Sequence, residues 1–413
     1  MSLGNDDAIL ALLTPEAVRQ RCHELLEMAA ADELDHFQYH ADNLGVATEL
    51  VVDEITSNYP GGKVPFHSRW RHFEFGERDL WAELASHLPD ISSAEKARRR
   101  IDLAVVSVLL DAGAGPDWTY KDTATGLVYG RSEGLALASI RLVESGLLSR
   151  YGKDDPIRVD AEALEKLSPN QLAEMFQVRS DNPLVGLDAR ADLLNRLGSA
   201  LSMAPSLFSH NGETRPGHLY DYLASLQQNG ALKARGILIA LLEGLGGIWP
   251  EGERIGDILL GDVGHHKKIV RQDVTNGLLP FHKLSQWLAY SLIEPLQEAG
   301  ITITELDTLT GLAEYRNGGL FMDTKVLTLR QNQAVAMSHH PKSPLVVEWR
   351  GLTVALLDKV AAAVRQQTGD DAESLPLASV LQGGTWTAGR RIAKQLRAGG
   401  GPPLTLDSSG TIF

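Results

Sequence analysis

Apolar residues recur every three to four positions along most of this chain, the spacing that gathers them on one face of an α-helix. We therefore predict a mainly α, multi-helical globular fold. The predicted helices cover residues 14–30, 32–56, 93–111, 132–145, 160–176, 187–202, 217–227, 232–245, 279–298, 347–367 and 387–398. Local signals mark some ends: Ser132 can cap the helix it begins, Gly146 can end that helix, and Pro280 suits a first turn.

Strand patterns are few and short, and the clearest lies in residues 313–330. There Asn317-Gly318 is a dipeptide typical of a two-residue hairpin turn, and its flanks suit strands. We predict a short β-hairpin near residues 313–330. Because side chains alternate along a strand, Glu314 and Arg316 would share one face of it.

No repeat of fixed period and no low-complexity tract divides the chain, so domain boundaries must be sought in loops. The stretch Gly152-Lys-Asp-Asp-Pro156 has the composition of a loop. We expect an N-terminal helical part, residues 1–155, with anion- and sugar-binding loops, and a helical catalytic part, residues 156–413. A chain of 413 residues can bury a large core, and we expect both parts to pack as one continuous unit.

Composition narrows the choice of partners. The formal net charge is −14, which is the wrong sign for a surface that binds nucleic acid. A single cysteine, Cys22, excludes an intramolecular disulfide. Neither a membrane-spanning apolar run nor a secretory signal is apparent. We expect a cytoplasmic protein that binds a small molecule, with no nucleic-acid or membrane partner, and the sequence leaves the oligomeric state open.

Signature motifs for phosphate or metal binding are missing, because the chain has no Walker loop, no His-Glu-x-x-His and no Cys-x-x-Cys. His36 and His40 have a spacing that can bind a metal from one helix face. The pair His265-His266, which follows Asp262, could also ligate a metal. A structural role is the simpler interpretation of both pairs, and we expect neither a metal nor an organic cofactor.

Residues 65–73 place Arg69 and Arg71 among His67, Trp70 and a serine. Arginine binds phosphate or carboxylate through two parallel N–H groups, so this segment suits an anion. Stacking of the arginines on tryptophan at the surface is the alternative.

Residues 111–134 include a Gly-rich loop between two predicted helices. Asp117 and Trp118 on this loop could hold a polar ring or a sugar, because loops carried by a rigid scaffold often bind ligands. A simple connection between the helices is the alternative.

In the predicted helix 279–298, His282, Gln286 and Tyr290 fall four residues apart and form one polar-aromatic stripe. A solvent face would usually carry Glu and Lys at these positions, so the stripe suits the lining of a pocket. A buried helix with a few satisfied polar groups is the alternative.

These segments together resemble the uracil catabolism protein four family. The matching residues are His67-Ser-Arg-Trp-Arg-His72, Asp111 to Tyr120, Arg131-Ser-Glu-Gly134, Pro280-Phe-His-Lys-Leu-Ser-Gln-Trp287 and Glu314-Tyr-Arg-Asn-Gly-Gly319. The family is distantly similar to queuosine salvage proteins, which are N-glycosidases with a helical fold related to DNA glycosylases. An Asp-Tyr-Arg segment supplies their key carboxylate, and Glu314 matches that acid with Glu in place of Asp.

The resemblance implies an N-glycosidase-type hydrolase in uracil and pyrimidine catabolism. Its substrate would be a small nucleoside- or nucleotide-like molecule, namely a ribosylurea-like intermediate, with or without a 5′-phosphate, that releases urea. The implied catalytic residues are Glu314, Arg316, His282 and Asp117. The implied substrate-binding residues are His67, Arg69, Trp70, Arg71, Asp111, Trp118, Tyr120, Arg131, Glu133, Lys283, Gln286, Trp287 and Asn317.

On this hypothesis Glu314 would stabilise an oxocarbenium-like state or orient a water molecule, and Arg316 would hold its carboxylate in place. His282 or Asp117 would give a proton to the leaving nitrogen, and the arginines of residues 65–73 would hold a 5′-phosphate.

Two other classes of protein stay open. A metal-dependent amidohydrolase acting on a ring-opened ureide would use Asp262, His265 and His266. A non-catalytic protein that binds a pyrimidine ligand would need no reactive group.

Overall fold

In a computed structural model that describes residues 5–249 and 252–407, the chain folds into two compact units. Unit 1 contains residues 5–67, 252–286 and 305–407, and unit 2 contains residues 68–249 and 287–304. Each unit is therefore assembled from segments that are far apart in the sequence. Residue 155, where we expected the N-terminal part to end, lies inside unit 2.

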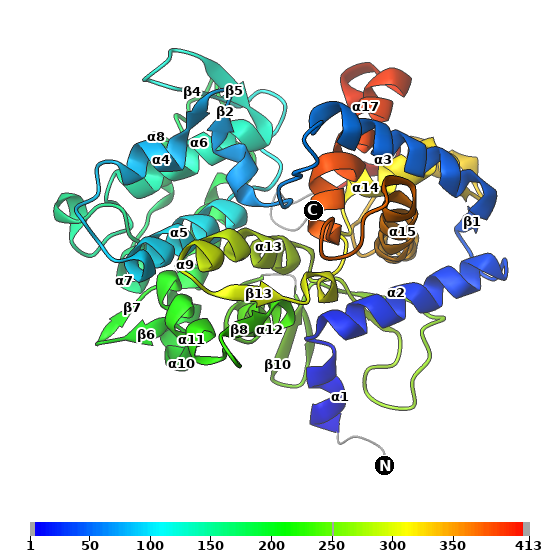
Figure 1. Ribbon diagram of the computed structural model, residues 1–413, viewed down its shortest axis with the longest axis horizontal. Coiled ribbons are helices and arrows are strands. Elements are labelled where there is room, and N and C mark those ends of the chain that lie inside the picture. The colour runs from blue at the N-terminus through cyan, green and yellow to red at the C-terminus, as the bar shows by residue number, and fades with distance from the viewer. Residues whose placement is uncertain (1–4, 250–251, 408–413) are drawn as a thin grey trace. The chain divides into compact units, whose positions relative to one another are not determined.

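Unit 1 is built around the long helix α15, which is buried along most of its length because α2, α3 and α14 pack against it (Figure 1). A π-helix (Leu381–Thr385) joins α16 to α17. The helices of unit 1 are α1 (Asn5–Ala11), α2 (Pro15–Ala30), α3 (Leu44–Asn58), α14 (Tyr315–Asp323), α15 (Pro344–Thr368), α16 (Leu377–Val380) and α17 (Trp386–Leu396). Helix α13 (Lys283–Glu298) begins in unit 1 and continues in unit 2.

The strands of unit 1 form two-stranded pairs rather than a layer. Three pairs are antiparallel: β1 (Phe37–Tyr39) with β14 (Leu327–Leu329), β9 (Glu253–Ile255) with β10 (Ile258–Gly261), and β11 (Val263–His265) with β12 (Leu278–Pro280). The fourth pair, β15 (Ser338–His339) with β16 (Thr405–Leu406), is parallel. Such short pairs position loops and contribute little core, since a lone hairpin is marginally stable in water.

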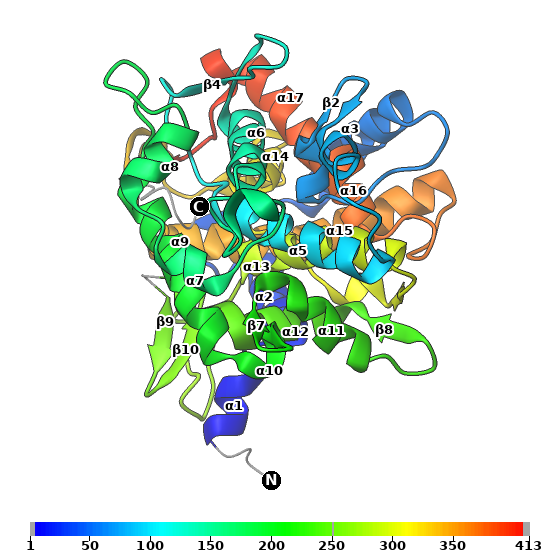
Figure 2. The same cartoon turned by 90° about the vertical axis from the view of Figure 1, so that its left-hand side faces the viewer.

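Unit 2 is also helical, and α5, whose second half is almost fully buried, packs against α6 and α9 (Figure 2). Its helices are α4 (Leu80–Ala85), α5 (Ser93–Leu109), α6 (Arg131–Glu144), α7 (Ala161–Glu165), α8 (Pro169–Met175), α9 (Leu187–Met203), α10 (Pro205–Phe208), α11 (Leu219–Ser225) and α12 (Ala234–Leu245). Its strand pairs are β2 (Glu74–Phe75) with β3 (Arg78–Asp79), β4 (Thr119–Lys121) with β5 (Val128–Gly130), β6 (Ser209–His210) with β7 (Glu213–Thr214), and β8 (Ala231–Lys233) with β13 (Thr302–Thr304).

The prediction of a mainly α fold is confirmed, and most helices lie within a few residues of their predicted positions. The predicted helix 160–176 is interrupted, since residues 161–165 form α7 and residues 169–175 form α8. Two of the predicted end signals are wrong. Helix α6 begins at Arg131 after Gly130, so Ser132 lies inside the helix and does not cap it. Pro280 lies in strand β12, and α13 starts only at Lys283.

The predicted hairpin near residues 313–330 is wrong. Residues 315–323 form helix α14, and only Leu327–Leu329 is a strand, which pairs with β1. The turn dipeptide is overridden because Gly318 lies against α15: a Cβ on it would stand 2.7 Å from the Trp349 ring. Glu314 and Arg316 therefore do not share a strand face.

The predicted helix 32–56 is wrong at its start. Residues 37–39 form strand β1, and α3 begins at Leu44, so His36 and His40 do not share a helix face. Glu348 holds this strand by accepting the backbone N–H groups of His36 and Phe37 at 3.0 and 2.8 Å. That carboxylate lies more than 300 residues away in the chain, so no local pattern signals it.

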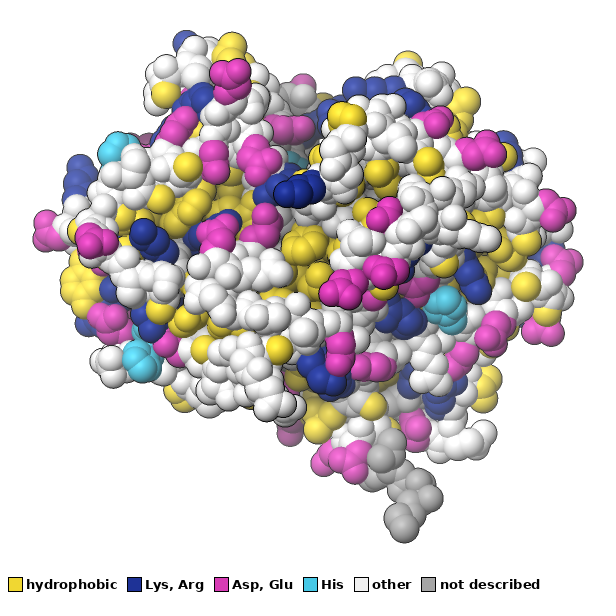
Figure 3. All heavy atoms as spheres, viewed as in Figure 1, with side chains coloured by type: hydrophobic (Ala, Val, Ile, Leu, Met, Phe, Trp, Pro, Cys, Tyr) yellow, Lys and Arg dark blue, Asp and Glu magenta, His cyan; other side chains and the backbone are white. Residues whose placement is uncertain are grey.

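The charges are distributed without a dominant patch on the face shown in Figure 3, where Asp and Glu side chains are interspersed with Lys and Arg. Among the described residues, no helix is both long enough and apolar enough to cross a lipid bilayer.

Candidate functional site

Glu314 is the N-cap residue of α14, and its side chain turns back onto the first turn of that helix. Oε2 accepts the N–H of Arg316 at 2.7 Å, and Oε1 accepts the N–H of Asn317 at 2.6 Å. These N–H groups have no partner within the helix, and the positive end of the helix dipole favours a carboxylate. Both carboxylate oxygens are thereby fixed in orientation, and each keeps a further lone pair.

Burial sets the electrostatics of Glu314, which is 8% exposed. Loss of water raises the pKa of its carboxyl above the ordinary value, while the N–H groups of Arg316 and Asn317 and the charge of Lys283 act in the opposite direction. A buried carboxyl with a shifted pKa and a nearby cation is common at catalytic sites, although structural networks shift pKa values too.

Arg316 positions Glu314 differently from our prediction. Its backbone N–H contacts the carboxylate, whereas its guanidinium donates from Nη1 to the carbonyl of Gly400 at 2.6 Å and lies 5.0 Å from the ring centre of Tyr315. The positioning therefore comes from the helix backbone and not from a charged side chain.

Asn317 is fully buried and ties the first turn of α14 to its surroundings. Its Nδ2 donates to the carbonyl of Leu312 at 3.3 Å, and its Oδ1 accepts from the hydroxyl of Thr385 at 2.9 Å. Thr385 ends the π-helix, an element that occurs often at functional sites.

A second polar group of unit 1 surrounds the start of α13. Arg350 donates to Asp262 through Nη1 at 2.8 Å and Nη2 at 2.7 Å, and the backbone N–H of Lys283 donates to the same carboxylate at 3.0 Å. Although burial acts to raise it, the charge and hydrogen bonds of Arg350 hold the pKa of Asp262 below its usual range. Nε of Arg350 also lies 3.4 Å from the carbonyl of Ala313, so this arginine links the starts of α13 and α14.

His282 directly precedes α13 and is 1% exposed. Its Nε2 lies 2.9 Å from the carbonyl of Leu12, which can only accept, so Nε2 carries the proton. Its Nδ1 is buried and has no hydrogen-bond partner among residues 5–249 and 252–407. Burial lowers the pKa of the ring. The neutral ring therefore offers a lone pair at Nδ1, whereas the predicted proton-donor role requires an imidazolium.

The other predicted residues of unit 1 make internal contacts. Gln286 donates from Nε2 to the hydroxyl of Thr310 at 2.9 Å. Nδ1 of His67 lies 2.9 Å from Oε1 of Gln382, in the π-helix. These contacts match the alternative of a buried polar helix, and substrate binding by Gln286 and His67 stays a prediction.

In unit 2, both arginines of residues 65–73 lie beside carboxylates. Nη1 of Arg69 is 3.0 Å from Oδ1 of Asp111, and Arg69 is fully buried. Nη2 of Arg71 is 2.8 Å from Glu294 and 3.0 Å from Glu74. These carboxylates therefore already balance most of the positive charge that the two arginines could offer to a phosphate.

Trp70 and Trp118 are core residues of unit 2. The indole N–H of Trp70 donates to the carbonyl of Ser291 at 2.7 Å, and its ring lies 4.0 Å from the guanidinium carbon of Arg100. The indole N–H of Trp118 donates to the carbonyl of Phe176 at 3.0 Å. Binding of a substrate by either ring would require these neighbours to move, and both substrate-binding roles stay predictions.

The remaining predicted residues of unit 2 differ in exposure. Asp117 and Arg131 are exposed, Glu133 is half-buried and Tyr120 is buried. Arg131 has a φ of 53°, in the left-handed region that non-glycine residues rarely adopt. Such positions are enriched near functional sites, so Arg131 stays a candidate for substrate binding.

The residues of the amidohydrolase alternative do not come together around one point. Asp262 is bonded to Arg350, the His266 ring lies 3.2 Å from Glu348, and His265 is exposed. Within the part of the chain that the structure describes, no three His, Cys, Asp or Glu side chains are arranged to hold a metal.

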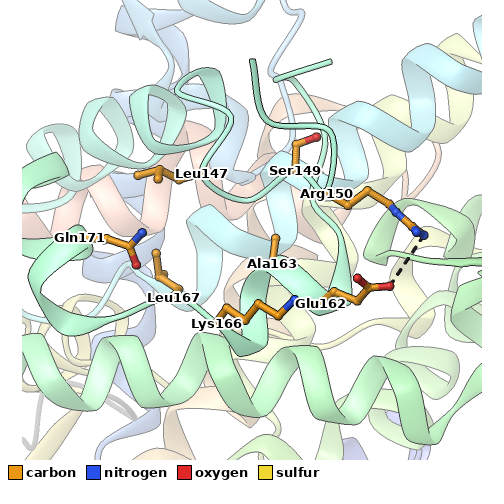
Figure 4. A pocket seen from close by; sticks show the side chains of 8 residues that line it. All are labelled: Leu147, Ser149, Arg150, Glu162, Ala163, Lys166, Leu167 and Gln171. Carbon is orange, nitrogen blue, oxygen red and sulfur yellow. Dashed lines mark ion pairs between the residues drawn. The ribbon is translucent and has the colours of Figure 1, made fainter. Parts of the chain in front are cut away.

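Unit 2 also has two open hollows. Figure 4 shows one of about 260 Å³, lined by Leu147, Ser149, Arg150, Glu162, Ala163, Lys166, Leu167 and Gln171. Its ion pair, Arg150 with Glu162, spans 3.8 Å between exposed side chains. The other, of about 460 Å³, is lined by Glu95, Arg98, Arg99, Arg158, His210, Asn211, Glu213, Arg215 and His218. Carboxylates pair with all four of its arginines, so this hollow presents no unpaired arginine to a ligand. In the first hollow, Lys166 is exposed and forms no ion pair among the described residues.

Three residues that contact the first turns of α13 and α14 were not predicted from the sequence: Thr385, Trp349 and Arg350. Trp349 donates from Nε1 to the carbonyl of Gly318 at 3.1 Å. A signal was present, because Glu348-Trp349-Arg350 interrupts the mostly apolar first half of α15, and buried charged residues require partners.

The fold and this site define a mainly α-helical protein with a buried carboxylate fixed at a helix N-terminus. The chain belongs to the family described as "Protein of unknown function (DUF1688)", whose model matches residues 11–413. It is 37% identical over 418 residues to "Protein urg3" of Schizosaccharomyces pombe, covering 98% of this chain and 99% of that protein. It is 36% identical over 412 residues to "Uracil catabolism protein 4" of Lachancea kluyveri, covering 92% of each chain.

Proposed function

We propose that this protein acts in uracil catabolism as an N-glycosidase that releases urea from a ribosylurea-like substrate. The name of the Lachancea kluyveri relative supports the pathway, since the two chains are similar along almost their full lengths. The buried, fixed carboxylate of Glu314 is the observation that carries the reaction.

In this reaction, the bond between the anomeric carbon and a urea nitrogen breaks, and its electron pair stays on the nitrogen. Positive charge develops on the sugar, and a nearby carboxylate stabilises that charge most strongly where water is excluded. The oxygen of a water molecule then bonds to the anomeric carbon. One water proton passes to Glu314 and the leaving nitrogen gains a proton, so the products are the free sugar and urea.

The fixed orientation of Glu314 supports this role. Its two N–H partners belong to its own helix, so the carboxylate needs no reorganisation when the sugar becomes charged. Burial disfavours an isolated negative charge, and a cationic transition state relieves that cost. A general base of this kind contributes roughly 10²–10⁴-fold to a rate.

The group that protonates the leaving nitrogen is a separate question. His282 in its neutral form presents a lone pair, so it would accept a hydrogen bond from an N–H of the substrate instead of giving a proton. Asp117 is exposed to solvent. We therefore propose that Nδ1 of His282 accepts a hydrogen bond from an N–H of the substrate or an O–H of water and so orients that molecule. The proton that reaches the leaving nitrogen then comes from solvent.

The test is to incubate the purified protein with ribosylurea and, separately, with ribosylurea 5′-phosphate, and to assay free urea. We expect release from at least one substrate, insensitive to chelation, with a loss of at least 100-fold in Glu314→Gln. Absence of urea from both substrates would refute the glycosidase. Tight binding without turnover would favour a non-catalytic ligand-binding protein, and activity lost on chelation and restored by metal would favour an amidohydrolase.

A further inference from the structure

Arg69 in unit 2 is held rigidly. It is 0% exposed and begins a short 3-10 helix, residues 69–72. Its backbone N–H donates to the hydroxyl of Ser291 at 2.9 Å, and its Nε donates to the hydroxyl of Ser107 at 2.7 Å. Ser107 is itself fixed, because its hydroxyl lies 2.6 Å from that of Ser139. The guanidinium therefore has one orientation, set by serines of three different helices.

One end of this guanidinium is not satisfied. Nη1 lies 3.4 Å from the carbonyl of Ser132 and 3.0 Å from Oδ1 of Asp111, but Nη2 is buried without a hydrogen-bond partner among the described residues. Oδ1 of Asp111 likewise accepts no hydrogen bond of normal geometry there. A buried charged donor left unmet costs stability, so an arrangement of this kind calls for a bound partner.

The charges around Arg69 argue against an anion as that partner. Asp111 already stands at ion-pair distance, and the negative charge of Glu133 also acts on the guanidinium. A phosphate or carboxylate placed against Nη2 would stand close to the Asp111 carboxylate, and like charges repel strongly at low dielectric. A neutral acceptor meets no such penalty.

The neighbours of the pair suit a flat group. The guanidinium carbon lies 5.7 Å from the ring centre of Trp287 and 5.9 Å from that of Phe73, and the rings of His72 and Trp287 meet edge to face. Aromatic walls of this kind favour planar, delocalised ligands. Asp111 keeps 8% of its side chain exposed, so the pair borders solvent at the carboxylate.

We propose that Arg69 and Asp111 form a recognition site for a neutral ureide, –NH–C(=O)–NH₂. Nη2 of Arg69 donates to the carbonyl oxygen, and the carboxylate of Asp111 accepts an N–H. One planar ligand thus satisfies a donor and an acceptor that belong to the same ion pair, and a phosphate satisfies only one of them. This inference concerns unit 2 alone, and it rests on the proposed function only for the class of ligand, a ureide.

The test measures binding apart from catalysis. Glu314→Gln blocks turnover, so calorimetric titration of that variant with ribosylurea reports binding alone. Asp111→Asn keeps the shape of the carboxylate but removes its charge, and Arg69→Lys keeps the charge but removes the planar fork. Each change should weaken ribosylurea binding roughly 10- to 100-fold, because it removes a hydrogen bond to a charged group, and such bonds are stronger than those between neutral groups. Inorganic phosphate should not compete.

The matched controls are Arg158→Lys and Asp160→Asn, which alter another buried arginine–aspartate pair of unit 2, joined at 2.6 Å. These should leave ribosylurea binding within about twofold, which excludes a general effect of disturbing a buried pair. Thermal unfolding of every variant identifies any that fails to fold, and Asp111→Asn carries the test if Arg69→Lys does not fold.

Several results would overturn the inference. They are unchanged binding in well-folded Arg69→Lys and Asp111→Asn, competition by inorganic phosphate that depends on Arg69, or no binding of ribosylurea to wild type and Glu314→Gln alike. The proposed function fails separately. Arg69-dependent binding without urea release refutes the glycosidase alone, and urea release by wild type together with unchanged ribosylurea binding in both variants refutes the ureide site alone.

Discussion

Oε1 of Glu314 accepts the backbone N–H of Asn317 at 2.6 Å, so the carboxylate proposed to act on the substrate is also the cap of helix α14. Glutamate is an unusual cap, because Asp, Asn, Ser and Thr reach the same N–H groups with less side-chain freedom to lose. Because Glu is the longer acid, replacing it with Asp can separate the capping of the helix from the proposed reaction.

Glu314→Asp should keep the cap and lose the reaction. The shorter acid is a preferred cap residue, so the free energy of unfolding should stay within about 1 kcal/mol of wild type. Its carboxylate stands roughly one bond length back, and displacements near 1 Å can cost about 10²-fold in rate. Urea denaturation and the urea-release assay check the two parts.

The control for that variant is Ser92→Ala, which removes the cap of α5, where the hydroxyl accepts the N–H of Glu95 at 3.2 Å. It should cost about 1 kcal/mol of stability and leave kcat unchanged. A normal kcat in Glu314→Asp would mean that Glu314 is a structural cap only.

The stability difference between wild type and Glu314→Gln should depend on pH. Burial raises the folded-state pKa of Glu314 above that of the unfolded chain, so the folded state binds more protons between those two values. The contribution of this carboxyl to stability is then fully present below the unfolded pKa and is lost as pH rises through the folded one. Gln cannot ionise. The free energy of unfolding of Glu314→Gln should therefore increase relative to that of wild type as the pH rises from 4.

Urea denaturation of both proteins from pH 4 to 8 measures this difference. The raised pKa would be contradicted if the difference in free energy of unfolding did not change with pH, or if wild type became more stable relative to the variant as the pH rose.

His282 should be neutral and protonated at Nε2 at pH 6.5. Its Nε2 lies 2.9 Å from the carbonyl of Leu12, and burial lowers the pKa of the ring below its ordinary value. Because the folded pKa is depressed, the stability that this ring contributes is present above the unfolded pKa and is lost as pH falls toward the folded one. Long-range nitrogen–proton NMR spectra distinguish the two tautomers and the imidazolium. An imidazolium at pH 6.5 would restore His282 as a candidate proton donor.

Gly318→Ala should destabilise unit 1 by about 1–3 kcal/mol. The added Cβ would meet the Trp349 ring at 2.7 Å and Oγ1 of Thr353 at 2.8 Å, and α15 is too well packed to retreat. Gly45→Ala is the matched control, since it also lies in a helix, α3, but a Cβ there meets nothing within 4 Å. Alanine should stabilise that helix by about 0.5–1 kcal/mol. Equal effects of the two changes would contradict the close approach of α14 and α15.

The pattern of apolar residues was sufficient to predict most helices, because the spacing that gathers apolar residues on a helix face is local to the sequence. Helix α9 (Leu187–Met203) differs by one residue from its predicted end and α5 by two. The candidate segment at Glu314 was also recognisable from its sequence, but its conformation was not. The dipeptide Asn317-Gly318 favours a turn locally, and only the packing of Gly318 on Trp349 makes a helix the better solution.

The sequence by itself thus determined the helical class of the protein, since that class rests on patterns within a few residues of each other. The acid on which the proposed chemistry depends was implied by the family resemblance of its segment. Tertiary structure alone decided which N–H groups bond to that acid and which carboxylates lie beside the arginines near residue 70. Glu314 is fixed by the N–H groups of a helix that forms only against α15, and Arg69 is balanced by Asp111, 42 residues further along the chain. Such long-range partners follow from the folded chain, because no local pattern encodes which distant charge a buried group will meet.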